Sequence, residues 1–344
     1  MKAVVVQEGK TIAIKDRPIP TLDDDEILVK TVALAQNPTD WKFVDRIQIV
    51  DTILGCDWSG YVAQTGKNVT FPKVGDHVAG FVQGGTYQDR GAYAEYLKTP
   101  AELSWVVPEG VLSHEQLATL GCAFWTAIQA LYHPKRLAFV EPPEKVDKEQ
   151  WIFVYGGSSS VGQYAIQLAH LSGYKVVTTA SPHNFELVKS LGADVFFDYK
   201  DPEVVSKIRA ATGDSIRDSF DTISLRESQE ISAKVIAPDG GRLILLLAPI
   251  AEAKVRDDVK ITHTLIYTAL GRTFSLGPNS LYTASSEDRN HMAAFLKKIP
   301  TLVKEGKILP NRIRLWEGGL DGIPEGLQYM REGKVSAEKI VYRV

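Results

Sequence analysis

The sequence contains very little cysteine, which excludes a fold held together by disulfides. Cys56 and Cys122 are the only two cysteines in 344 residues. Two thiols supply neither the cross-links of a small secreted domain nor the four ligands of an all-cysteine structural zinc site. We therefore expect both to be buried small side chains, and the fold to rest on a hydrophobic core.

Long hydrophobic runs are also missing. The most apolar stretch, around residues 243–248, is far shorter than the roughly 20 residues that cross a bilayer. The N-terminal residues lead directly into an apolar strand and then into the acidic segment 23–26, with no signal-peptide cleavage site between them. The sequence thus predicts a cytoplasmic protein that does not associate with membranes.

Neither sign of charge dominates. The formal net charge is −3, with 24% charged and 44% hydrophobic residues. This balance argues against a broad surface for nucleic acid or anionic lipid. The chain is longer than a single core usually supports, and we expect two lobes with a cleft between them.

From Trp151 onward, apolar runs alternate with helical segments. Strands are expected at 151–155, 175–179, 195–197, 220–223 and 242–247, with helices near 161–172, 185–191, 204–211 and 231–237. This alternation predicts a parallel sheet covered on both faces, the doubly wound α/β arrangement. The first 120 residues carry short strands between Gly, Pro and Asp turns, which predicts a compact β domain. A helix after about Asp288 and a final strand at 339–343 are expected to return to that first lobe.

The most specific local pattern is a glycine- and serine-rich turn where a strand ends and a helix begins. Its glycines permit a tight turn and close packing of the helix, whose N-terminus offers free amides to a pyrophosphate. Ser159 replaces the middle glycine of the usual dinucleotide fingerprint, and the serine hydroxyls are additional phosphate donors. Such a turn alone is equally typical of an ordinary connection, but the parallel lobe around it favours nucleotide binding. The predicted cofactor contacts here are Gly156, Gly157, Ser158, Ser159, Ser160, Val161 and Gly162.

The end of the second strand favours NADPH over NADH. NAD-binding folds usually carry an acidic residue about 20 positions after the turn, whereas residues 180–184 contain none. A carboxylate there would repel a 2′-phosphate. Ser181, His183 and Asn184 can donate hydrogen bonds to that phosphate, and Tyr199 at the end of the next strand is expected to close the pocket. The alternative is that Ser181 merely starts a helix and that His183 is solvated.

Several motifs along nearly the whole chain resemble those of the medium-chain dehydrogenase/reductases. They are residues 1–5, 37–42, 55–60, 74–78, 91–96, the turn at 156–162 and the tail at 333–340. Residues 181–185 and 267–274 are similar, more narrowly, to quinone-oxidoreductase-like enzymes and above all to fungal trans-acting enoyl reductases. The resemblance implies a GroES-like catalytic domain, at 1–125 and 290–344, and a Rossmann domain that binds NADPH, at 126–289. It also implies a polyketide synthase as a possible partner.

The resemblance is to the branch without catalytic zinc. Asn37 and Asp40 lie where a first zinc ligand would fall, and Cys56-Asp57 replaces the usual His-Glu pair. One thiol with scattered carboxylates is a poor zinc site, so no metal is expected. Asp40 and Asp57 are expected to fix loop geometry rather than to transfer protons.

Without a metal to stabilise an alkoxide, a conjugated double bond is an easier substrate than a simple ketone. Hydride addition to the β-carbon places charge on an enolate oxygen, which needs only hydrogen-bond donors. The resemblance implies Lys42 as the residue that orients the carbonyl or supplies charge, with Asn37 and Thr126 beside the nicotinamide and substrate. Leu276 is expected to cover the cofactor. The alternatives are a solvated lysine at 42 and a helix-packing threonine at 126.

The sequence therefore predicts an NADPH-dependent enoyl or enone reductase. Two alternatives stay open: a quinone reductase, whose substrate is a flat ring, and a protein that binds NADPH without catalysis and acts as a partner or sensor.

Overall fold

The computed structural model describes residues 1–277 and 280–344, which divide into two compact units. Unit 1 comprises residues 1–125, 267–306 and 310–344, and unit 2 comprises residues 126–266 and 307–309. Helix α3 (Cys122–Tyr132) contains the passage of the chain from unit 1 to unit 2. Within the described residues, no helix combines the length and the apolar character that a bilayer crossing requires.

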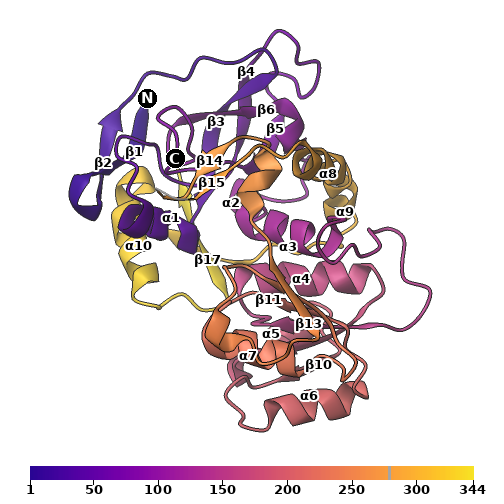
Figure 1. Ribbon diagram of the computed structural model, residues 1–344. Helices are drawn as coiled ribbons and strands as arrows, with labels where there is room; N and C mark the ends of the chain where they lie inside the picture. Colours follow the sequence, from indigo (N-terminus) through magenta and orange to yellow (C-terminus); the bar gives the residue numbers. More distant parts are fainter. Residues whose placement is uncertain (278–279) are drawn as a thin grey trace. The chain divides into compact units, whose positions relative to one another are not determined.

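Unit 2 is a doubly wound α/β domain, as the alternation of strands and helices predicts (Figure 1). Its six strands are all parallel and follow the order β10-β9-β8-β11-β12-β13. The strands are β8 (Trp151–Tyr155), β9 (Lys175–Thr179), β10 (Val195–Phe197), β11 (Asp218–Asp221), β12 (Gly241–Leu245) and β13 (Val259–His263). The helices are α4 (Ser160–Leu171), α5 (Phe185–Ser190), α6 (Val204–Thr212) and α7 (Arg226–Lys234). In this topology the order in which strands are added reverses between β8 and β11, and ligands bind there at the carboxyl ends of the strands.

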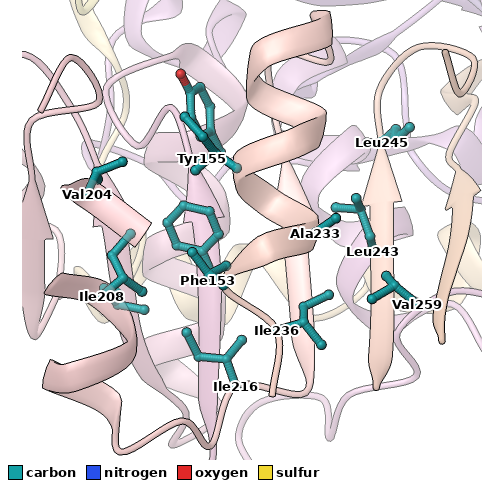
Figure 2. Packing of buried hydrophobic residues seen from close by; sticks show 13 residues of the cluster. Phe153, Tyr155, Val204, Ile208, Ile216, Ala233, Ile236, Leu243, Leu245 and Val259 are labelled. Atoms are coloured by element: carbon teal, nitrogen blue, oxygen red, sulfur yellow. The ribbon is translucent and has the colours of Figure 1, made fainter. Parts of the chain in front are cut away.

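Apolar side chains from the sheet and from its covering helices form the core of unit 2. Phe153 of β8 and Ile208 of α6 are both fully buried in one cluster. Figure 2 shows the Phe153 ring with Val204 and Ile208 on one side and Ala233 of α7 on the other. Side chains of α6 and α7 therefore pack closely with those of the sheet that carries the glycine-rich turn, and this packing keeps the sheet rigid.

Two elements of unit 2 begin two or more residues earlier than expected. Strand β11 begins at Asp218, two residues early, because the Arg242 side chain on the neighbouring strand neutralises that carboxylate at 2.7 and 2.9 Å. Helix α7 begins at Arg226 instead of near residue 231, since its first turn is polar and carries no apolar periodicity. In both cases the first residues of the element are charged or polar, so the hydrophobic pattern begins later in the sequence than the element does.

Unit 1 is built on a seven-stranded mixed sheet (Figure 1). Its strand order is β16-β17-β3-β4-β5-β7, and β6 also pairs with β3. The strands of the unit are β1 (Lys2–Gln7), β2 (Thr11–Asp16), β3 (Glu26–Ala35), β4 (Asp57–Thr65), β5 (His77–Phe81), β6 (Tyr96–Pro100), β7 (Ser104–Val106), β14 (Phe274–Ser275), β15 (Leu281–Tyr282), β16 (Arg312–Trp316) and β17 (Glu338–Arg343). The helices are α1 (Pro38–Lys42), α2 (His114–Ala118), α8 (Ser286–Leu296), α9 (Ile299–Lys304) and α10 (Ile323–Arg331).

The end of the chain returns to the first lobe, as expected. Strand β17 pairs antiparallel with β3, with Val341 opposite Ala35. This pairing brings the last residues of the chain beside the segment that follows β3, where Asn37 lies. Tertiary structure thus joins two parts of the sequence about 300 positions apart.

Residues 267–277 and 280–289 depart from the expected domain bounds, because they belong to unit 1 and not to the unit of the parallel sheet. The Tyr267 ring lies 5.8 Å from that of Phe43, and the Arg272 guanidinium lies 2.7 Å from the buried Glu26 carboxylate. Long-range aromatic and ionic contacts decide this placement.

Candidate functional site

The glycine-rich turn of unit 2 has the backbone geometry that phosphate binding requires. Gly156 has φ +75°, a conformation that favours glycine. At Gly162 a Cβ atom would lie 2.3 Å from the Gly156 carbonyl oxygen, so only glycine lets helix α4 begin this close to the turn. The helix starts at Ser160, and the amides of Ser160 and Val161 in its first turn have no acceptor within the helix.

Ser159 is engaged inside the protein. Its side-chain oxygen accepts a hydrogen bond from the Gly162 amide at 2.9 Å, which caps helix α4. The same hydroxyl pairs with the Thr222 hydroxyl at 2.8 Å, just after β11. Ser159 therefore ties the turn to the neighbouring strand, and Ser158 and Ser160 are the half-buried hydroxyls that remain for a ligand.

These features fit the pyrophosphate of a dinucleotide. The turn lies at the carboxyl end of β8, beside β11, where the strand order reverses. Free amides and the positive end of a 12-residue helix both favour an anion there. The residues of this turn would hold the phosphates of a nicotinamide cofactor.

The residues predicted to select NADPH lie at the same edge of the sheet. Ser181 follows β9, and Tyr199 follows the adjacent β10. A hydrogen bond of 3.0 Å from the Ala180 amide to the Phe197 carbonyl joins the ends of these two strands. His183 is exposed and Asn184 is buried, and their side-chain nitrogens are 3.2 Å apart.

Tyr199 is half-buried between aromatic and basic neighbours. Its ring centroid lies 6.4 Å from that of Tyr155, and the Lys200 ammonium lies 5.7 Å from it. A hydroxyl from Ser181 and a cation from Lys200 are therefore available at this edge, and the segment 180–184 contains no carboxylate.

In unit 1, the segment after β3 forms a short helix that positions Asn37 and Lys42. Asn37 precedes helix α1, and Pro38 begins it. The backbone N–H of Asn37 donates to Asp40 Oδ2 at 2.7 Å, and the Tyr93 hydroxyl donates to the same oxygen at 2.8 Å. Asp40 thus fixes the loop, which agrees with the role expected for it.

Asp57 is the centre of a fully buried hydrogen-bond network. Its Oδ2 accepts from Asn37 Nδ2 at 2.8 Å and lies 3.0 Å from Lys339 Nζ. Its Oδ1 accepts from the Cys122 amide at 2.5 Å, at the start of α3. The Lys339 ammonium also donates to Asn37 Oδ1. Asn37, Asp57 and Lys339 are each at most 3% exposed.

Lys42 ends helix α1 and is half-buried. Burial lowers the pKa of its ammonium, and the positive charge of Arg46 lowers it further. Its Nζ lies 5.7 Å from the centre of the Trp41 ring. Among residues 1–277 and 280–344, no carboxylate forms an ion pair with this ammonium, so its charge is available to a ligand.

The two other predicted site residues lie in different units. Thr126 is buried in α3 and is the first residue of unit 2. Leu276 belongs to unit 1, where its amide donates to the Ser280 hydroxyl at 3.0 Å. The structure therefore does not place Leu276 in the unit that carries the other predicted cofactor residues, because residues 267–289 pack with unit 1.

Sequence reasoning did not single out Lys339 or Tyr93 as site residues. Lys339 lies in β17 between Glu338 and the apolar residues 340–342, and nothing in this pattern marks it as a site residue. Thr39 and Tyr267, whose hydroxyls form a short hydrogen bond, form a further contact between distant segments of unit 1. None of these pairings follows from spacing in the sequence.

The residues near Asn37 do not fit a zinc ion. Cys56 is the one thiol in this segment, and a single thiol among carboxamide and carboxylate neighbours is a poor ligand set for zinc. Within the described chain, no three His, Cys, Asp or Glu side chains are grouped to hold a metal. The side chains of Asn37 and Asp57 are hydrogen-bonded to each other, and Lys339 donates to Asn37 and forms an ion pair with Asp57.

The comparisons with known proteins agree with this architecture. The family described as the alcohol dehydrogenase GroES-like domain matches residues 23–109, and the family described as zinc-binding dehydrogenase matches residues 160–267. A trans-enoyl reductase of Alternaria alternata is 40% identical over 100% of this chain and 98% of its own length. A zinc-type alcohol dehydrogenase-like protein of Schizosaccharomyces pombe is 36% identical over 100% of both chains. The solved structure of CurK enoyl reductase has the same fold, with a TM-score of 0.77 at 19% identity over 99% of this chain and 98% of that one.

A GroES-like unit together with a Rossmann unit defines a two-domain oxidoreductase that uses a nicotinamide cofactor. The chain belongs to the medium-chain dehydrogenase/reductase superfamily, and the fungal trans-enoyl reductases are among its relatives. This membership confirms the family resemblance that was predicted from the sequence motifs.

Asp40 gives the site a titration that can be measured. Burial raises the pKa of its carboxyl to about 7, and the Asp57 charge acts in the same direction, whereas the two hydrogen bonds lower it. Because the folded-state pKa exceeds the unfolded one, the folded state binds this proton more tightly. Its contribution to stability is complete below about pH 4 and is lost as the pH rises through about 7.

We predict that Asp40→Asn removes this dependence. The free energy of unfolding of the variant minus that of the wild type should increase by about 1–3 kcal/mol from pH 5 to pH 8. Urea denaturation at both pH values measures the difference, and Asp16→Asn, at an exposed acid, is the control. A difference that does not change with pH would show that Asp40 is ionised throughout.

Proposed function

We propose that this protein reduces a carbon–carbon double bond conjugated to a carbonyl, in an enoyl thioester or an enone, with NADPH as the reductant. The observation that carries the proposal is the chemistry of the unit 1 site, where amide and ammonium donors take the place of metal ligands. The full-length likeness to trans-enoyl reductases supports the same reaction.

The residues of unit 1 suit an enolate better than an alkoxide. NADPH, when bound, supplies the hydride that adds to the β-carbon. Asn37 and Lys42 donate hydrogen bonds to the carbonyl oxygen, on which negative charge develops, and a proton adds to the α-carbon to give the saturated product. A half-buried ammonium without a carboxylate partner stabilises that charge more strongly than a solvated one, because fewer water molecules screen it.

The cofactor is bound through unit 2 in this proposal. The amides of Ser160 and Val161, with the hydroxyls of Ser158 and Ser160, hold the pyrophosphate. Ser181, His183, Asn184 and Tyr199 hold the 2′-phosphate, while Thr126 and Leu276 contact the nicotinamide end. The acyl substrate is either free or attached to a carrier, and a polyketide synthase is the proposed source of a carrier-bound chain.

The reaction is tested by following NADPH oxidation with crotonyl thioesters, enones, ketones and quinones. We expect the saturated thioester or ketone to be the product of the conjugated substrates. Turnover of quinones alone would establish the quinone reductase instead. NADPH binding without turnover of any free or carrier-bound substrate would favour a non-catalytic partner or sensor.

The choice of cofactor has a separate test at Ser181. An aspartate at this position would place a negative charge next to the proposed 2′-phosphate. We expect Ser181→Asp to raise the Kd of NADPH at least tenfold and to leave the Kd of NADH within threefold, as measured by fluorescence titration. Ser181→Ala is the uncharged control. An equal change in the Kd of both cofactors would show that the 2′-phosphate does not bind at Ser181.

Lys42 is tested by Lys42→Met, which keeps the length of the side chain and removes its charge. We expect kcat/KM for an enoyl thioester to fall about 100-fold, with an unchanged Kd for NADPH. The alkaline limb of the kcat/KM profile, which the lowered pKa of Lys42 places below the value of a free lysine, should disappear. The control is Lys30→Met, an exposed lysine of β3. Retention of full kcat/KM would remove Lys42 from the mechanism.

A further inference from the structure

The Asn37 carboxamide lies between two fully buried groups of opposite hydrogen-bonding character. A lysine ammonium only donates, and an ionised aspartate only accepts. Lys339 Nζ donates to Asn37 Oδ1, while Asn37 Nδ2 donates to Asp57 Oδ2 at 2.8 Å. Rotating the amide by 180° would bring its oxygen against the carboxylate and its nitrogen against the ammonium, so one orientation is strongly preferred.

This arrangement leaves Asn37 with one defined free group. The amide nitrogen carries two hydrogens, of which Asp57 takes one, and the amide oxygen is occupied by Lys339. The group that stays available is therefore the second N–H of Nδ2. A carbonyl oxygen that becomes an enolate requires a donor at this place, and a rotated amide would instead present an acceptor.

The position of Lys339 is itself fixed from outside the site. It lies in β17, which pairs with β16 on one side, where Lys339 is opposite Ile313, and with β3 on the other. The ammonium is 2% exposed and lies 3.0 Å from Asp57 Oδ2, so it has little freedom to move away. The end of the chain thus supplies a charge to a loop 302 positions earlier in the sequence.

We propose that Lys339 is a positioning residue, which together with Asp57 holds the Asn37 carboxamide so that its free N–H faces the substrate carbonyl. This inference rests on the proposed function, in which Asn37 binds that carbonyl. Lys339 does not touch the substrate. It acts by fixing which atom of Asn37 is offered.

The charge of the network supports the assignment. Asp40 of α1 and Asp57 of β4 are both buried, and Lys339 is the cation that neutralises Asp57. Asp40 keeps its proton up to about neutral pH, since burial raises its pKa to about 7. Loss of Lys339 would therefore leave the Asp57 carboxylate buried without a counter-ion.

The test compares Lys339→Met with the charge-neutral double variant Asp57→Asn/Lys339→Met. Removal of one partner is expected to lower the melting temperature, and removal of both charges is expected to restore most of it. If Lys339 positions Asn37, kcat for an enoyl thioester should be reduced at least tenfold in both variants, because neither has the donor to Asn37 Oδ1. Lys339→Arg, which keeps a donor-only cation, should retain kcat within about threefold.

Two controls separate this effect from a general loss of structure. Lys334→Met changes an exposed lysine of the same C-terminal segment and should leave kcat unchanged. The Kd of NADPH should stay within twofold in all variants. A double variant that recovers both melting temperature and kcat would overturn the proposal, as it would show that charge balance alone matters. If Lys339→Met does not fold, the double variant and Lys339→Arg still decide the question.

A second readout does not depend on turnover. In protein labelled with ¹⁵N at asparagine, the side-chain resonances of Asn37 can be assigned by their loss in Asn37→Ala. We expect two well-separated, slowly exchanging N–H signals in the wild type, and collapse or fast exchange of these signals in the double variant. Unchanged signals would refute the positioning role. Changed signals in a protein that turns over no enoyl substrate would instead refute the proposed function and leave the positioning intact.

Discussion

The buried Asp57 carboxylate is the constraint on which the candidate site of unit 1 depends. A fully buried charge is tolerated only when it is paired and hydrogen-bonded. Asp57 meets this requirement with the side chains of Asn37 and Lys339 and the backbone amide of Cys122. Satisfying one charge thus fixes the loop before α1, the start of α3 and the last strand relative to one another within the unit.

The candidate cofactor site of unit 2 is built differently. Its main contacts are backbone amides at the start of α4, held in place by Gly156, Gly162 and the Ser159 cap. These contacts lie within seven residues of one another in the sequence. One side-chain bond, from Ser159 to Thr222, joins the turn to the neighbouring strand. A backbone site of this kind tolerates a serine at the middle position of the usual glycine motif, because that serine also caps the helix.

The two kinds of site explain what could be predicted. The parallel sheet and the return of the final strand follow from local patterns of apolar residues, and the structure has both. The glycine-rich turn also follows from a local pattern, and phosphate binding by it stays a prediction. The placement of residues 267–289 could not be predicted in this way. It depends on contacts of Tyr267 with Phe43 and of Arg272 with Glu26, which lie more than 200 positions away in the sequence. The early start of β11 likewise depends on the pairing of Asp218 with Arg242 across the sheet.

The sequence by itself determined the two-domain class, because alternating strands and helices and residue types at short spacing encode it. It also predicted the nucleotide turn and a site without zinc, and both stay predictions. The family resemblance also singled out Asn37, Asp40 and Asp57, which lie in two separate segments of the sequence. Only the tertiary structure decided which of these carboxylates has a counter-ion and which way the Asn37 amide faces. The reason is that the deciding group, the Lys339 ammonium, reaches the site through the pairing of β17 with β3, and strand pairing over such a distance is set by the packing of the whole sheet.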